Sequence, residues 1–155
     1  MSNFFAELED RLQRVQASRD DVGQLLEKME HDLKVAEYNR DRSSDWALKI
    51  AHEAILTGCA ALMNAHGYRA KVNGHHYVTI RFAQLALPQH TALFDRAEML
   101  RRRRHQVSYG GIYTVSEEEV EGALKLARRL APILRKAARA VMVKGGADPT
   151  DQLGQ

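Results

Sequence analysis

With 155 residues, the chain is long enough for one domain with a buried core, and its composition excludes several classes of protein. Apolar residues make up 45% and charged residues 28%, which are ordinary values for a soluble globular domain. The single cysteine excludes an internal disulfide framework, and a net charge of +3 is too small to indicate a nucleic-acid partner by itself.

The N-terminal residues lack the basic segment and the apolar core of a signal peptide. No apolar run approaches the roughly 18 residues that a membrane span requires. The lone Cys59 lies in an apolar stretch and is expected to be a small core residue. We therefore expect a cytoplasmic protein without membrane contact.

Helical periodicity runs through most of the chain, and no convincing strand is apparent. We expect residues 1–17 to form an amphipathic N-terminal helix, because their large apolar side chains recur at helical spacing. The next helix begins after Ser18, a suitable N-cap. A third helix, over about residues 45–65, is the most apolar and carries a stripe of small side chains. Since small side chains let a neighbour approach closely, we predict that this helix is central.

A polar loop over residues 69–74 leads to the second half of the chain. The helices predicted there cover about residues 75–86, 90–109 and 117–144. The glycines at 110–111 end the second of them. Ser116 and Glu119 form a capping box for the last one, in which Pro132 predicts a kink.

These elements predict an all-α fold, an up-and-down bundle of four core helices preceded by the N-terminal helix. The bundle covers residues 18–144. Residues 145–155 are rich in glycine, proline and aspartate, and we expect them to form a disordered tail.

A basic segment near the end of the helix over residues 90–109 is the most informative part of the chain. Four consecutive arginines, Arg101 to Arg104, are followed by His105 and Tyr109. Such a run is usually a solvated basic face. Because residues about one turn apart share a helix face, however, Arg101, His105 and Tyr109 can meet the same ligand.

This segment resembles the motif of HEPN domains, whose late helix carries an arginine and, four to six residues further on, a histidine. Residues 46–54 resemble the Ala-rich second helix of that family, and residues 67–69 followed by 74–76 resemble its turn into a short third helix. The resemblance covers about residues 18–140. It implies a HEPN-like four-helix core that dimerises and brings two copies of the motif together.

For many members, the resemblance also implies metal-independent cleavage of RNA, in which the arginine stabilises the phosphate and the histidine moves the proton of the ribose 2′-hydroxyl. Arg104 takes the arginine position here, and Tyr109 falls where the histidine is often found. Tyrosine has a pKa near 10, so it is a poor base at neutral pH unless neighbouring cations lower that pKa. His105 is the other candidate acid or base, and a surface histidine is its alternative interpretation.

Two hypotheses follow from the resemblance. The first is an RNA-directed protein acting as an endoribonuclease of a toxin–antitoxin or defence system, with Arg104, Tyr109 and His105 as its catalytic residues. The second is a non-catalytic module that binds nucleic acid or a partner protein such as a nucleotidyltransferase. In both, Arg101, Arg102, Arg103 and Arg104 bind RNA phosphates. We expect a homodimer, with RNA and a cognate antitoxin as further partners.

The remaining histidines give weaker signals. His75 and His76 are adjacent and lack nearby cysteines or acids, which makes a zinc site a poor interpretation, so we expect packing or helix capping and no metal or cofactor. His52 and Glu53 lie on the predicted central helix. We interpret them as polar surface or interface positions, although an acid there can also face the motif.

Overall fold

Helices make up most of the computed structural model, which describes residues 3–72, 74–109 and 114–144, and only the backbone of residues 108 and 109. In chain order the elements are the 3-10 helix η1 (Ala6–Arg11), strand β1 (Leu12–Arg14), helices α1 (Arg19–Asn39) and α2 (Ser44–Ala65), strand β2 (Tyr68–Ala70), helix α3 (His75–Ala86), the 3-10 helix η2 (Pro88–His90), and helices α4 (Thr91–Tyr109) and α5 (Glu117–Lys144). The prediction of an all-α bundle is confirmed, with a small two-stranded sheet added to it.

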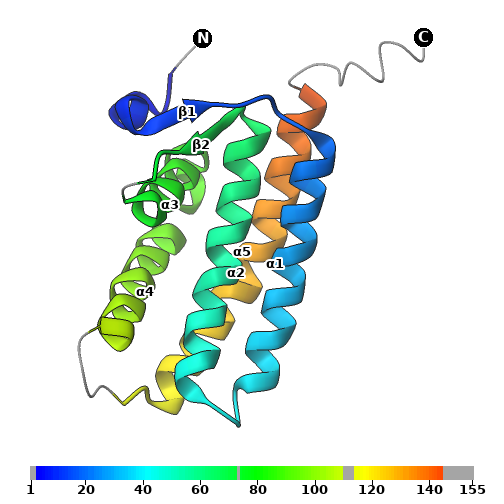
Figure 1. Cartoon of the computed structure of the whole chain (residues 1–155). Helices are drawn as coiled ribbons and strands as arrows, with labels where there is room; N and C mark the ends of the chain where they lie inside the picture. Colours follow the sequence, from blue (N-terminus) through cyan, green and yellow to red (C-terminus); the bar gives the residue numbers. More distant parts are fainter. Residues whose placement is uncertain (1–2, 73, 110–113, 145–155) are drawn as a thin grey trace.

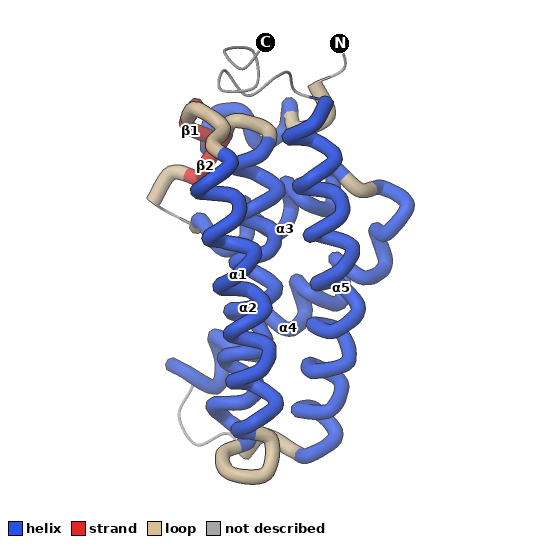
Figure 2. The backbone as a smooth tube through the Cα atoms, turned by 90° about the vertical axis from the view of Figure 1, so that its right-hand side faces the viewer, coloured by secondary structure: helices blue, strands red, loops and turns tan. Residues whose placement is uncertain are grey.

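The long helices α1, α2 and α5 lie side by side, and α3 and α4 follow one another along the opposite flank of α2 (Figures 1 and 2). Helix α2 contacts all four other α-helices, as predicted for the central helix. The sheet lies at the end of the bundle where α3 begins (Figure 1). This arrangement places the start of α3 and the middle of α4 against one face of α2.

Side-chain caps decide where three of these helices begin. The hydroxyls of Ser18 and Ser43 each accept a hydrogen bond from the backbone N–H three residues later, at 3.2 and 3.3 Å. Ser116 and Glu119 form the predicted capping box, in which each side chain accepts from the other residue's backbone N–H. At the end of α2, Gly67 has a φ of 87°, the left-handed conformation expected of a residue that terminates a helix.

The N-terminal segment differs from the amphipathic helix predicted over residues 1–17, because among its described residues, 3–17, only those of η1 are helical. Within the described residues, η1 is followed by β1, which pairs antiparallel with β2 in the stretch predicted to be a polar loop. The rings of Phe4 and Phe5 each lie 5.3 Å from that of Phe82 on α3. Leu8 and Leu12 join this second apolar cluster. These apolar contacts and the hydrogen bonds between β1 and β2 stabilise this conformation. They therefore override the helical periodicity of the local sequence.

Two predictions concern residues outside the part of the chain that the structure describes. The helix stop at residues 110–111 and the tail at 145–155 lie outside the described residues. Helix α5 runs unbroken through Pro132, and the kink predicted there stays a prediction. Across the described ranges, no helix is long and apolar enough to cross a membrane.

Close packing at Gly58 joins the three long helices. A β-carbon at this position would lie 2.5 Å from Sδ of Met29 on α1 and 2.8 Å from Cδ1 of Leu134 on α5. The missing side chain therefore lets both neighbours approach α2, as the stripe of small residues predicted. By contrast, a β-carbon on Gly122 of α5 would have no neighbour within 4 Å.

We expect Gly58→Val to lower the free energy of unfolding by about 1–3 kcal/mol, because the added methyl groups overpack this three-helix contact. Gly122→Val introduces the same side chain on a helix with free space around it, so it is the matched control and is expected to leave stability nearly unchanged. Urea unfolding of both variants measures the difference. Equal stabilities would show that the contact at Gly58 can relax without cost.

Candidate functional site

The arginines of α4 point to different neighbours. Arg103 donates two hydrogen bonds to the carboxylate of Glu119 on α5, at 2.5 and 3.0 Å, and a third to the carbonyl of Thr114. Arg103 therefore ties α4 to the start of α5. Arg102 is largely exposed, with 72% of its side chain accessible, and lies 3.3 Å from a carboxylate oxygen of Glu98. These contacts of Arg102 and Arg103 are with residues of α4, of α5 and of the segment before α5, and not with α2 or α3.

Arg101 lies on the side of α4 that meets α3. Its guanidinium carbon is 5.9 Å from the ring centroid of Tyr77, a first-turn residue of α3. The same guanidinium binds Glu98 one turn back, through hydrogen bonds of 2.5 and 2.9 Å. On α3, Tyr77 also has the guanidinium of Arg11 at 5.7 Å from its ring centroid. Two cations thus flank the first turn of α3.

Two histidines from different helices meet beside these arginines. His52 on α2 is 0% exposed, and its ring centroid lies 5.5 Å from that of His76 on α3. His76 is half-buried, and its ring is 4.2 Å from that of His75. His75 is exposed, and its Nδ1 lies 3.2 Å from the carbonyl of Val72 at the start of α3. His76 is therefore the member of the pair that solvent or a ligand can reach.

The positive charges of Arg101 and Arg104 influence the pKa values of both histidines. Burial lowers the pKa of His52 to about 3, and the charges of Arg104, His76 and Arg101 act in the same direction. Burial likewise lowers the pKa of His76 to about 4, helped by His75, Arg104 and Arg101. Both imidazoles are consequently neutral at pH 7, beside two permanent positive charges.

Several buried polar atoms in this cluster have no hydrogen-bond partner among the described residues. They are both ring nitrogens of His52 and Nε of Arg104. A buried donor left without a partner costs about 1–3 kcal/mol, so such groups are uncommon away from functional sites. A phosphate group, which offers several acceptor oxygens, matches the Nε–H donor of Arg104 chemically.

A family model of the HEPN domain matches residues 22–137, which is well over half of the chain. The chain belongs to the HEPN domain family. This confirms the resemblance inferred from the sequence. HEPN domains have nucleotide-related or ribonuclease-like roles, commonly act as dimers and bind RNA. No curated protein and no solved structure matches the chain.

The structure of this HEPN domain brings two arginines of the motif segment together with histidines of other helices. His105 is exposed on α4, and Tyr109 is the last residue of that helix, with a side chain outside the described part of the structure. Arg101 and Arg104 instead share their surroundings with His52 and His76. The catalytic roles of Arg104, His105 and Tyr109 stay predictions.

His52 is the residue that the sequence analysis interpreted wrongly, because it is buried and not a surface position. A signal was present: Leu48 and Ile55, one turn away on either side along the helix, are buried apolar residues. A histidine on the apolar face of a central helix is therefore a candidate for a site. Within the described ranges, no group of three His, Cys, Asp or Glu side chains is arranged to hold a metal ion.

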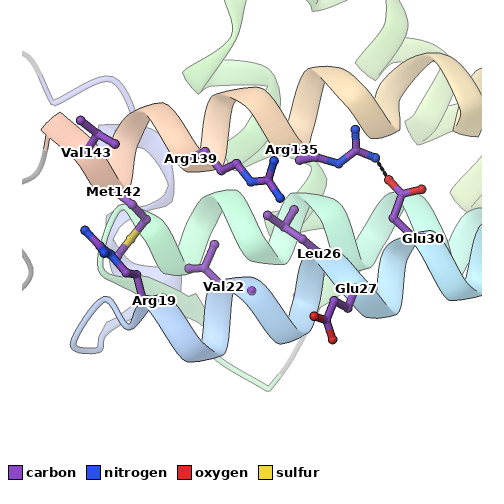
Figure 3. A pocket seen from close by; sticks show the side chains of 10 residues that line it. Arg19, Val22, Leu26, Glu27, Glu30, Arg135, Arg139, Met142 and Val143 are labelled. Carbon is purple, nitrogen blue, oxygen red and sulfur yellow. Dashed lines mark ion pairs between the residues drawn. The ribbon is translucent and has the colours of Figure 1, made fainter.

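A groove of about 460 Å³ lies elsewhere, between α1 and α5 (Figure 3). Val22, Leu26 and Met142 supply its apolar surface, and an ion pair between Arg135 and Glu30 lies at its side (Figure 3). Neither the histidine pair nor the α4 arginines line this groove. We therefore place the candidate site of the HEPN domain where α2, α3 and α4 meet.

The buried histidine predicts a pH dependence of stability. Because the pKa of His52 is lower in the folded protein than its ordinary value near 6.5, folding favours the neutral form. The stabilisation is present above about pH 6.5 and is lost as the pH falls towards 3. At pH 5 the loss from His52 is about 2 kcal/mol.

We expect His52→Leu to reduce the difference in unfolding free energy between pH 7 and pH 5, measured by urea denaturation. His31→Leu, which changes an exposed histidine on α1, is the control and should keep the wild-type difference. An unchanged difference in the His52 variant would contradict a buried neutral imidazole.

Proposed function

We propose that this HEPN protein is RNA-directed and that Arg101 and Arg104 bind phosphate groups of the RNA backbone. The observation that carries the proposal is the convergence of these two arginines with His76 and the buried His52. The unpartnered Nε of Arg104 supplies a donor for a phosphate oxygen. An arginine that lacks a protein partner at this atom suits an anionic ligand.

The start of α3 supports an anion at the same place. Gly74, in the left-handed conformation, is its N-cap and provides no side chain to bind the free backbone N–H groups. The first turn contains no acidic residue, so the positive end of the helix dipole is not offset there. Glu98 is the carboxylate held against Arg101 in this region. Positive charge therefore dominates beside His76.

The activity that we propose is metal-independent endoribonuclease cleavage. Arg101 and Arg104 would stabilise the charge that develops on the phosphate as the 2′-oxygen attacks it. The setting that we propose is a toxin–antitoxin or defence system with a cognate antitoxin. The presence of Tyr109 at the histidine position favours a second candidate, a non-catalytic HEPN module that binds RNA or a nucleotidyltransferase.

The proposal predicts salt-dependent RNA binding together with cleavage in excess EDTA. Each phosphate contact contributes about 0.7 to the log–log salt slope on single strands, so Arg101→Ala/Arg104→Ala should reduce the slope by about 1.4. The same double variant should cleave RNA more slowly. Fluorescence anisotropy with labelled single-stranded RNA measures the slope, and denaturing gels measure cleavage.

Arg139→Ala is the control, since Arg139 is an exposed arginine at the separate groove between α1 and α5. It should leave the salt slope within experimental error of the wild type. Wild-type binding that does not respond to salt would contradict the phosphate contacts. Tight, salt-dependent binding without any cleavage would support the non-catalytic module instead.

We also propose a homodimer formed through the outer face of α4. Met99 on this helix is 69% exposed, which is unusual for a large apolar side chain. It borders a hollow between α4 and α5 that Leu100, Ala123 and Leu126 also line. A second copy docked on this face would bring the two α4 helices together and cover Met99. The family's common dimeric state supports this arrangement.

Sedimentation velocity at micromolar concentration should therefore show a dimer for the wild type and a monomer for Met99→Glu, because a buried charge disfavours the interface. Val143→Glu is the control, as Val143 is 77% exposed but lies at the groove between α1 and α5. Dissociation by the Val143 variant alone would place the interface on that other face. A monomeric wild type would contradict a homodimer.

A further inference from the structure

His76 is the one histidine of the central pair that lies within reach of a ligand. It is half-buried in the first turn of α3, whereas its neighbour His52 is fully buried on α2. The guanidinium carbon of Arg101 lies 5.9 Å from the ring centroid of Tyr77, the next residue along α3, and the charges of Arg101 and Arg104 both act on His76. A phosphate held by the two arginines therefore lies beside the imidazole of His76.

We propose that His76 is the general base of the RNA cleavage reaction and takes the proton of the ribose 2′-hydroxyl. This inference rests on the proposed ribonuclease function, and it replaces Tyr109 and His105 in the proton-transfer role. The 2′-oxygen then bonds to phosphorus, the bond from phosphorus to the 5′-oxygen breaks, and the products are a 2′,3′-cyclic phosphate and a 5′-hydroxyl. Solvent water protonates the departing oxygen, and the resulting hydroxide takes the proton from His76.

The protonation state of His76 suits this role. Burial and the neighbouring cations keep its imidazole neutral at pH 7, so it can accept a proton without any prior ionisation. Tyrosine must first lose its own proton, which at neutral pH occurs in about one molecule per thousand for a pKa near 10. The histidine is thus in the form that can accept a proton at neutral pH, and its strength as a base depends on how far RNA binding raises its pKa from about 4.

RNA binding would strengthen His76 as a base. The charged and titratable groups around it are His75 and Tyr77 on α3, His52 on α2, Arg101, Arg104 and Glu98 on α4, and Arg11 at the end of η1. The three arginines among these groups are cationic and disfavour a further positive charge on His76. A phosphate between the arginines and His76 adds the opposite charge, which raises the pKa of the imidazole. Proton uptake is then linked to RNA binding.

The pH profile of the rate distinguishes His76 from Tyr109. The pH dependence of kcat/KM reports the pKa values of the free enzyme. A base with a pKa of about 4 therefore gives a kcat/KM that does not change between pH 5 and pH 8. A tyrosine base with a pKa near 10 would instead give a tenfold increase for each pH unit over the same range. A flat profile is expected, and a steep one would overturn the assignment.

Variants test the same inference in excess EDTA with a single-stranded RNA substrate. We expect His76→Ala to lower kcat by about 10²–10⁴ while the Kd for RNA changes little. His76→Gln, which keeps a polar side chain at the position, should be equally slow and covers the case in which the alanine variant fails to fold. His31→Ala, on the exposed side of α1, is the matched control and should cleave at the wild-type rate.

The outcomes separate this inference from the proposed function. Full cleavage by a folded His76 variant, with loss of cleavage in Tyr109→Phe or His105→Ala, would overturn the role of His76 and leave the ribonuclease function intact. A wild type that binds RNA but never cleaves it would overturn both. In support of the inference, NMR titration with a 2′-deoxy oligonucleotide should show the pKa of His76 rising from about 4 on binding.

Discussion

The burial of α2 is the constraint on which the rest of the structure depends. Its small side chains let α1 and α5 approach from one side, and at Gly58 both neighbours occupy the space where a side chain would be. The opposite side receives α3 and α4 (Figure 1). A polar residue on a covered face of this helix lies in the core, and this is the position of His52. The central helix thus holds an imidazole at the junction of three elements.

Burial and charge act together at that junction. Removing an imidazole from water disfavours its protonation, and the nearby Arg101 and Arg104 add to this effect. The same arginines attract anions, so the groups that keep the histidines neutral also favour a phosphate beside them. A ligand that neutralises the arginines would at once relieve their effect on His76. Under the proposed function, phosphate binding and proton uptake by His76 would be coupled for this reason.

The α4 arginines show how one basic run divides between structure and function. Arg103 binds Glu119, the residue that also caps α5, and so helps to fix the angle at which α4 meets the bundle. Arg101 and Arg104 lie towards α3 and α2, where they influence the histidines. Consecutive residues on a helix point about 100° apart, so a run of four must serve several directions. The run therefore meets several neighbours, and phosphate binding by Arg101 and Arg104 stays a proposal.

The sequence by itself determined what depends on local interactions. Helix starts at Ser18, Ser43 and Ser116 follow from side chains that bind backbone N–H groups within the same turn, and helical periodicity marked the central helix. The resemblance to HEPN domains, carried by segments spread along the chain, also identified the family.

Only the tertiary structure decided the features that join distant segments. The periodicity of the N-terminal residues predicted a helix, yet pairing of β1 with β2 and contacts of Phe4 and Phe5 with α3 impose another conformation. The candidate site has the same origin, since His52, His76 and Arg104 come from three helices. No spacing along the chain records which face of α4 meets α2 and α3, because helix packing sets that contact.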